Sequence, residues 1–202
     1  MVFERSKHLT ASLFGHVLNR RKNIHPKSII DGVTKKKSLK KVNPPPIQWG
    51  LDKEKAVLQQ YTNERLNENQ QIMNAGLIIN PIWPWLGTSP DGIVIEAGKI
   101  VGGIEIKCPF SKKDICFDEA ATMKDFFMVL NENGKPTPKP KHIYFFQFHG
   151  VMNIAQLEWI DFVVYTEKEL FIERIFCDTS LWHSKMLPEL TDFYISFIAE
   201  RL

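Results

Sequence analysis

Three cysteines are all that this sequence of 202 residues contains, and none forms a C-x-x-C pair. Cys108, Cys116 and Cys177 therefore predict neither a disulfide framework nor a cysteine-based zinc site. The sequence also lacks an apolar run of roughly 20 residues, which a membrane-spanning helix needs. The chain does not begin like a signal peptide, so we expect an intracellular protein, nuclear in a eukaryotic host and cytoplasmic otherwise.

Internal repeats and a G-x-x-x-x-G-K phosphate loop are absent as well, and no second hydrophobic unit indicates a further domain. Hydrophobic residues make up 44% of the chain and charged residues 24%. This composition is typical of a globular protein with a substantial core. We therefore predict one domain over residues 1–202.

Negative charge is scarce near the N-terminus, although the net charge is only +3. Residues 5–41 hold 11 of the 26 Lys and Arg residues but one of the 23 Asp and Glu residues, Asp31. The imbalance favours a polyanionic partner. A solvated loop, or a nuclear-import signal in Lys35–Lys37 and Lys40–Lys41, would explain it equally well. We expect a basic loop or insertion at about 21–46.

Charged side chains in apolar, strand-like sequence are the most informative feature of the chain. Asp91 follows Ser89-Pro90, and Glu105 and Lys107 alternate with Ile104 and Ile106. Residues two apart on a strand project from one face, so the acid and the base share a face and the isoleucines share the other. Charges in such surroundings are costly unless they are paired or bind metal.

A hairpin should bring Asp91 back toward Glu105, because the Ala97-Gly98-Lys99 turn joins two apolar segments. Two carboxylates and a lysine suit Mg²⁺ or Mn²⁺ with oxygen ligands, the ammonium lying near the attacking water or the developing phosphate charge. The alternative is that Glu105 and Lys107 pair on a solvated strand face.

Apolar periodicity and capping predict the remaining elements. Residues 142–156 favour a strand by propensity but suit a helix by length. The other expected elements are a helix capped by Thr10 or Ser12, helices over 47–66, 118–130 and 181–202 with a kink at Pro188, a loop over 131–141, and strands near 77–79, 157–165 and 171–177.

Five motifs, in this order, resemble the lambda-exonuclease and YqaJ viral-recombinase branch of the PD-(D/E)XK nuclease superfamily. They are Arg5-x-x-x-x-Thr10-Ala11-Ser12, Trp49-Gly50-x-x-x-Glu54, Ser89-Pro90-Asp91-Gly92, Glu105-Ile106-Lys107-Cys108-Pro109-Phe110, and Gln147 in the 144–152 segment.

The resemblance implies a metal-assisted hydrolytic site. Asp91, Glu105 and the main-chain carbonyl of Ile106 would bind Mg²⁺, or Mn²⁺, and Lys107 would orient or activate the attacking water. Glu54 would complete the acidic cluster from its helix.

The resemblance also assigns residues that meet the substrate. Gln147 would approach the metal-bound water or the scissile phosphate, and Arg5 and Ser12 would hold the 5′-phosphate of a duplex end. The family's usual second glutamine is His149 here, and His142 lies seven residues earlier without a further zinc ligand. Relatives usually carry an aromatic segment upstream of the position of Arg5.

The implied fold is an α/β (α+β), restriction-endonuclease-like domain with a central mixed β-sheet flanked by helices. The implied activity is metal-dependent exonuclease digestion of linear duplex DNA from 5′-phosphorylated ends, in recombination or repair. Ring-shaped homotrimers and a single-strand annealing protein are the partners that the family suggests. The alternatives are a non-catalytic nucleic-acid-binding domain and an endonuclease of the same superfamily.

Overall fold

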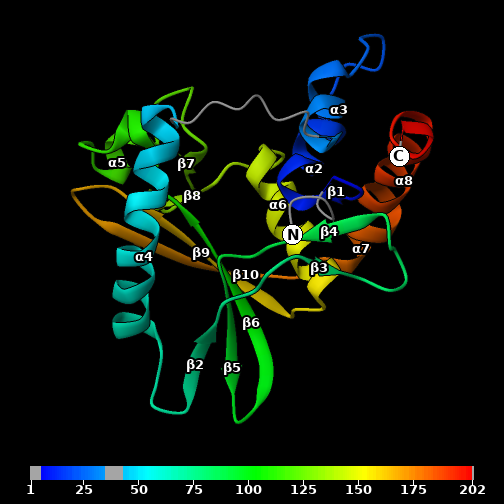
Figure 1. Ribbon diagram of the computed structural model, residues 1–202. Coiled ribbons are helices and arrows are strands. Elements are labelled where there is room, and N and C mark those ends of the chain that lie inside the picture. The colour runs from blue at the N-terminus through cyan, green and yellow to red at the C-terminus, as the bar shows by residue number, and fades with distance from the viewer. Residues whose placement is uncertain (1–5, 35–42, 202) are drawn as a thin grey trace.

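The computed structural model of the protein describes residues 6–34 and 43–201, and its centre is a five-stranded sheet (Figure 1). The strand order is β10-β9-β6-β5-β2. Strands β6 and β9 are parallel, whereas the other neighbours are antiparallel, so the predicted central mixed sheet is confirmed. The strands are β2 (Gln70–Met73), β5 (Gly92–Glu96), β6 (Lys99–Lys107), β9 (Trp159–Tyr165) and β10 (Leu170–Phe176).

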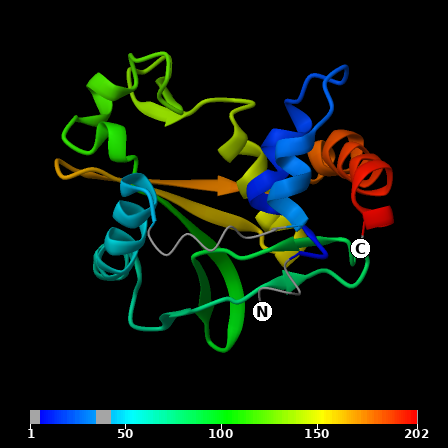
Figure 2. The same cartoon turned by 45° about the horizontal axis from the view of Figure 1, so that its top comes forward.

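Helices cover both faces of this sheet, as the oblique view in Figure 2 shows. On one face, Ile104 and Ile106 of β6 pack in a core with Val57 and Tyr61 of helix α4 (Pro45–Arg65). On the other face, helix α6 (Ile143–Ala155) places Phe148 against Phe162 of β9, with ring centroids 4.8 Å apart. The alternation along β6 is therefore the one that its sequence predicts.

The larger core lies on the α6 side and is closed by helices from both ends of the chain. Residues that share this core come from α2 (Ala11–Leu18), α3 (Lys27–Thr34) and α8 (Leu187–Phe197). Helix α8 follows α7 (Thr179–Leu181) and a π-helical turn, η2 (Trp182–Met186). Pro188 lies in the first turn of α8. Because proline has no backbone N–H, it cannot donate to the carbonyl four residues earlier, and the irregular turn lies directly before it.

Two glycines let α2 and α6 approach closely. A Cβ atom on Gly15 would lie 2.3 Å from the Ile143 Cα, and one on Gly150 would lie 2.4 Å from a ring carbon of Phe14. Both distances are far below van der Waals contact, so these positions admit only glycine at this helix spacing.

Two small sheets flank the main one. One has the order β1-β4-β3, formed by β1 (Leu9–Thr10), β4 (Leu86–Thr88) and β3 (Ile78–Ile79). In it, β1 pairs in parallel with β4, which ties the start of α2 to the strand that leads to Asp91. The other sheet pairs β7 (Met128–Leu130) with β8 (Pro136–Pro138).

The predicted helix over 118–130 is wrong. Helix α5 (Phe117–Ala120) ends after one turn, and residues 128–130 form β7. Tertiary contacts decide this outcome: Lys139 Nζ donates to the carbonyls of Lys124 and Phe126, and the rings of Phe126 and Phe127 are buried. The predicted 131–141 loop contains β8 for the same reason, because its strand pairs with β7.

The basic loop expected at about 21–46 needs a similar correction. Its residues 27–34 form α3, because Ile29, Ile30 and Val33 recur on one face and are buried. Lys35–Lys37 and Lys40–Lys41 lie outside the described residues. Pro45 and Pro46 start α4 rather than interrupt it, since the first turn of a helix needs no N–H groups from them.

The remaining predicted helices, at 10–18, 47–66 and the C-terminus, are confirmed, with short 3₁₀ turns at η1 (Phe110–Lys112) and η3 (Ala199–Arg201). Strands β1 and β2 were not predicted from the sequence. Over residues 6–34 and 43–201, no helix combines the length and apolar character that crossing a membrane requires.

Candidate active site

Asp91 lies where β4 has ended and β5 is about to begin, and the β5–β6 hairpin fixes its position. Its backbone N–H donates to the Ile104 carbonyl (3.1 Å), and its Oδ2 accepts from the Ile106 N–H (2.6 Å). Gly92 pairs with Ile104 at the end of the β5–β6 ladder, so both hydrogen bonds of Asp91 lie at that end. The hairpin thus brings Asp91 to β6, as predicted, and places the Ile106 main chain beside its carboxylate.

Glu105 and Lys107 share the face of β6 that is opposite to Ile104 and Ile106. The Lys107 Nζ lies 2.6 Å from the Glu105 Oε1, and the exposed fractions of the two side chains are 18% and 3%. The pair is therefore not on a solvated strand face, which was the alternative interpretation. A pair this deep must satisfy its polar atoms within the protein or through a ligand.

Gln147 reaches this pair from α6, where its Nε2 donates to the Glu105 Oε1. This contact depends on residues 143–155 forming a helix, because the packing of that helix on β9 points Gln147 toward β6. The structure thus brings Asp91, Glu105, Lys107 and Gln147 together from three separate chain segments.

Glu54, on α4, interacts electrostatically with the other acids of the site. Burial raises the pKa of Glu54, and the neighbouring Asp91 carboxylate raises it further, whereas Lys107 acts in the opposite direction. Glu54 also contributes to the raised pKa of Glu105. The three acids therefore act on one another, although α4 and α6 cover opposite faces of the sheet.

Burial is the largest influence on the pKa values of the Asp91 and Glu105 carboxyls. It raises the pKa of Glu105 to about 7, with Lys107 opposing and Asp91 reinforcing the rise. Burial likewise raises the pKa of Asp91, against the effects of Lys107 and of the Ile106 N–H. Desolvation lowers the pKa of the Lys107 ammonium, but the carboxylates of Glu105 and Asp91 more than offset this, and its pKa is raised.

The residues fit a hard divalent cation. The second oxygen of Glu105, Oε2, is buried and has no hydrogen-bond partner within the described chain, which is costly unless a ligand completes it. Across the described ranges no three His, Cys, Asp or Glu side chains are grouped to hold a metal ion. A cation here would instead need main-chain oxygen as well, and Asp91, Glu105 and the Ile106 carbonyl would provide an all-oxygen set that suits Mg²⁺ or Mn²⁺.

Tyr144 is a neighbour of this site that the sequence analysis missed. The Lys107 Nζ lies 4.8 Å from the centre of the Tyr144 ring, within the range of a cation–π contact. Tyr144 precedes Gln147 by three residues, so the two share a helix face. That spacing could have identified Tyr144 had the sequence settled on a helix over 142–156.

The predicted 5′-phosphate residues are placed only in part. Arg5 lies outside the described residues. Ser12 is exposed in the first turn of α2, and Thr10 is the N-cap residue, with its Oγ1 3.2 Å from the Ser12 Oγ. Ser12 is therefore open to a ligand at the helix N-terminus.

The two α6 histidines point to other partners. The buried His149 has its Nδ1 3.4 Å from the Asp178 backbone N–H and its ring against Phe145. Burial lowers the pKa of His149 despite the Asp178 carboxylate. The His142 Nδ1 accepts from the Tyr144 N–H and so caps α6. His149 is thus engaged at the start of α7.

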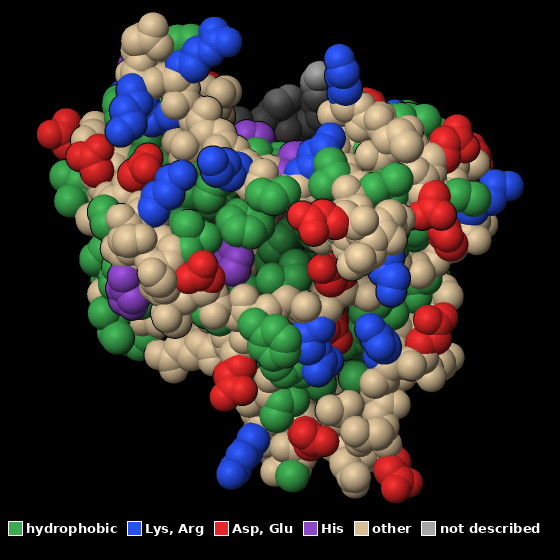
Figure 3. All heavy atoms as spheres, turned by 180° about the vertical axis from the view of Figure 1, so that it is seen from behind, with side chains coloured by type: hydrophobic (Ala, Val, Ile, Leu, Met, Phe, Trp, Pro, Cys, Tyr) green, Lys and Arg blue, Asp and Glu red, His purple; other side chains and the backbone are tan. Residues whose placement is uncertain are grey.

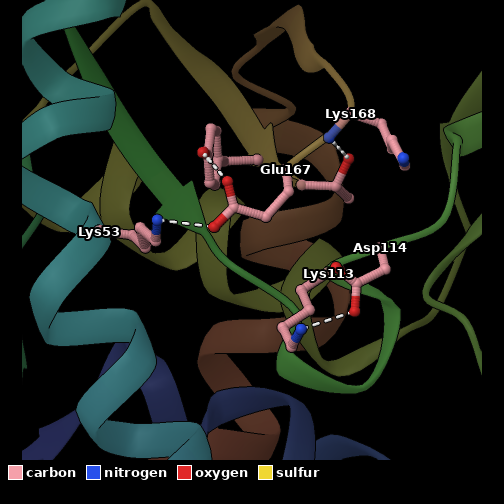
Figure 4. A network of polar contacts seen from close by, with 7 residues as sticks. Lys53, Lys113, Asp114, Glu167 and Lys168 are labelled. Atoms are coloured by element: carbon pink, nitrogen blue, oxygen red, sulfur yellow. Dashed lines mark hydrogen bonds and ion pairs between the residues drawn. The ribbon is translucent and has the colours of Figure 1, made fainter.

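Two of the lysines in Figure 4, Lys53 and Lys113, are paired with acids. Lys53, which precedes Glu54 on α4, lies 2.7 Å from Glu167, and Glu167 also accepts from the Tyr165 hydroxyl. Lys113 lies 2.6 Å from Asp114. These largely exposed pairs stabilise the surface little.

A cavity of about 460 Å³ adjoins the acids, and both Glu54 and Asp91 line it. It extends along α4 toward β2 and carries no residue of the α2 end of the molecule. The site therefore opens into a space large enough for part of a ligand.

Most of the chain matches a known protein family. Residues 3–157 match the model of the YqaJ-like viral recombinase domain. No curated protein sequence matches the chain.

Several solved structures are similar in fold. An alkaline exonuclease, LHK-Exo from Laribacter hongkongensis, is 24% identical over 98% of this chain and 92% of its own, with a TM-score of 0.69. The same exonuclease in complex with dAMP gives 24% identity, 98% and 91% coverage and a TM-score of 0.70. A SOX–DNA complex is 11% identical over 96% of this chain and 66% of its own, with a TM-score of 0.60.

Proposed function

Because the chain belongs to the YqaJ-like viral recombinase domain family, we propose that it is a metal-dependent exonuclease that hydrolyses linear duplex DNA from 5′-phosphorylated ends. The observation that carries the proposal is that Asp91 and Lys107 both contact the strand of Glu105, whose second oxygen is buried without a hydrogen-bond partner among the described residues. Similar folds include an exonuclease, the same exonuclease with dAMP, and a DNA complex. DNA is accordingly the substrate class that we infer.

The residues divide the chemistry among them. Mg²⁺, when held by Asp91, Glu105 and the Ile106 carbonyl, supplies positive charge that makes water more acidic and stabilises the phosphate under attack. Lys107 orients the attacking water, whose oxygen forms the new bond to phosphorus as the bond to the 3′-oxygen breaks. Gln147 positions Glu105 through its hydrogen bond and faces the water or the phosphate.

Selection of ends rests on the α2 terminus. Arg5 and Ser12 would bind the terminal 5′-phosphate, where helix N–H groups add to the attraction. We also propose that the chain acts as a homo-oligomer, as ring-shaped relatives do, because tethering to DNA favours processive digestion. The single strand left behind is the substrate of a single-strand annealing protein, which we propose as a partner.

The test compares linear and covalently closed circular duplexes in Mg²⁺. We expect loss of the 5′-phosphorylated linear duplex alone. Cleavage of circles would favour an endonuclease of the same superfamily, and binding without cleavage would favour a non-catalytic DNA-binding domain.

Asp91→Asn gives the first residue-level test. We expect digestion to fall by at least about a hundredfold, because one charged oxygen ligand is lost, while circular dichroism stays unchanged. Asp192→Asn is the matched control, since Asp192 is exposed on α8, away from the site. Retained activity in Asp91→Asn would overturn the assignment.

A further inference from the structure

The cavity next to the acids is mixed in character, which suits a nucleobase better than a phosphate. Its apolar lining includes Leu51 and Leu58 of α4 and Ile72 of β2, and its polar lining includes Gln59 and Asn74. Apolar side chains with a few placed polar groups are typical of small-molecule sites of this size.

Charge decides which part of a nucleotide can enter. Glu54 and Asp91 line the cavity together with one base, Lys55, so the acids outnumber the base and an anionic phosphate inside the cavity would be disfavoured unless a metal cation intervened. Of the two carboxylates that would hold the cation, Asp91 lines the cavity and Glu105 is not among its lining residues. A phosphate held by that cation leaves the attached sugar and base to extend along α4.

Gln59 and Asn74 have the chemistry to read the edge of that base. Both side chains are exposed to the cavity. The Gln59 Nε2 donates to the Asn63 Oδ1 (3.1 Å), whereas within the described chain nothing donates to its Oε1. The Asn74 amide has no hydrogen bond to any described residue. Amide side chains pair with donor and acceptor groups on base edges.

We propose that this cavity binds the nucleobase of the nucleotide next to the bond being cut, with Gln59 and Asn74 as base-contacting residues. The inference rests on the proposed function, since it supposes a phosphodiester at Asp91 and Glu105. Its consequence is a rate of digestion that depends on the base at this position.

Mononucleotide binding tests the cavity without any cleavage. Calorimetry in Mg²⁺ would compare the four deoxynucleoside 5′-monophosphates with 2-deoxyribose 5-phosphate, which lacks a base. We expect the tightest nucleotide to bind at least about tenfold more strongly than the sugar phosphate, as one good amide–base contact provides.

Two neighbouring glutamines supply a matched pair of variants. Gln59 and Gln60 are both exposed on α4, and each donates to a side chain four residues later, Asn63 or Glu64. Only Gln59 lines the cavity. Gln59→Leu should remove most of the preference for nucleotide over sugar phosphate, and Gln60→Leu should leave it intact. Asn74→Leu should act as Gln59→Leu does.

The outcomes separate the two proposals. If the protein digests linear DNA but binds nucleotide and sugar phosphate equally, or if Gln59→Leu behaves as Gln60→Leu, the cavity assignment fails and the exonuclease stands. If the base preference depends on Gln59 but no DNA is digested, the cavity binds a nucleobase, whereas the exonuclease and the placement of that base next to a cut bond both fail.

Discussion

Glu105 is the residue whose protonation links the site to pH. Its carboxyl has a pKa of about 7, raised chiefly by burial from an ordinary 4.5. A folded-state pKa above the unfolded value means that the folded chain holds this proton more tightly. The contribution of Glu105 to stability is therefore fully present at low pH and is lost as the pH rises from about 4.5 to about 7.

The raised pKa of Glu105 gives a prediction for the metal-free protein. Glu105→Gln removes the titration, so the variant should be more stable than the parent at pH 8, and the difference should shrink toward pH 5. Urea unfolding at both pH values, in chelator, measures it. A difference that is constant with pH would contradict the buried carboxyl.

Mg²⁺ should reverse the effect, because a divalent cation competes with the proton for Glu105. We expect the rise in melting temperature on adding Mg²⁺ to be larger at pH 8 than at pH 6 in the parent chain, and to be small at both in Glu105→Gln. Digestion should likewise need less Mg²⁺ as the pH increases through about 7.

At the scale of elements, α4 is fixed to the sheet by a polar network around the buried Asp161. The Tyr61 hydroxyl donates to the Asp161 Oδ2 (2.7 Å), and Asp161 on β9 accepts two bonds of 2.9 Å from Arg174 on β10. The Arg174 guanidinium carbon lies 3.5 Å from the centre of the Trp159 ring. Tyr61 follows Glu54 by two helical turns, so the network also holds the helix that carries Glu54.

Removing one hydroxyl tests this anchor. Tyr61→Phe should cost about 1–3 kcal/mol of unfolding free energy, because a buried carboxylate loses a donor. Tyr165, on the strand of Asp161, donates its hydroxyl to Glu167 at an exposed site, so Tyr165→Phe should cost less than about 1 kcal/mol. Equal losses in chemical denaturation would show that the buried bond contributes no more than the exposed one.

The α2–α6 contact is the second element-scale feature, because it sets the distance between the helix of Ser12 and the helix of Gln147. Gly15→Ala would drive a methyl group into Ile143, and we expect a loss of about 1–3 kcal/mol or more from overpacking. Thermal unfolding of the two glycine variants measures it. Gly50→Ala on α4 is the control: its Cβ would meet nothing within 4 Å, so alanine should stabilise that helix by up to about 1 kcal/mol.

At the scale of the molecule, positive charge is unevenly distributed. On the face seen in Figure 3, acidic and basic side chains are interspersed around a central hollow lined by hydrophobic side chains. The excess of basic residues lies in the N-terminal portion of the sequence. Five of these residues, Lys35–Lys37 and Lys40–Lys41, lie outside the described residues. These lysines lie between α3 and α4 in the chain.

Their replacement by glutamine should weaken DNA binding and flatten its dependence on salt, because each lost phosphate contact reduces the slope of log K against log salt by about 0.9. The hydrolysis rate at saturating DNA should not change. Fluorescence anisotropy with a labelled duplex at several salt concentrations measures the slope. An unchanged slope would indicate that the segment serves solubility or nuclear import.

Sequence by itself determined the hairpin and the faces of β6. Asp91, Glu105 and Lys107 could be grouped in advance because they lie on one hairpin, where period-two alternation and a tight turn fix their relative positions within 17 residues. Helix α4 was also determined locally, by its apolar spacing. The sequence did not determine whether the Glu105–Lys107 pair is exposed or buried, because burial depends on which elements cover the strand.

Tertiary structure alone decided the rest. Residues 143–155 became a helix because Phe148 packs on Phe162 and because glycines admit α2, and only then did Gln147 reach Glu105. Residues 128–130 became a strand because a partner at 136–138 was present. Local propensity differs between helix and strand by about 1 kcal/mol per residue or less, so contacts between distant segments outweigh it wherever the two preferences are close.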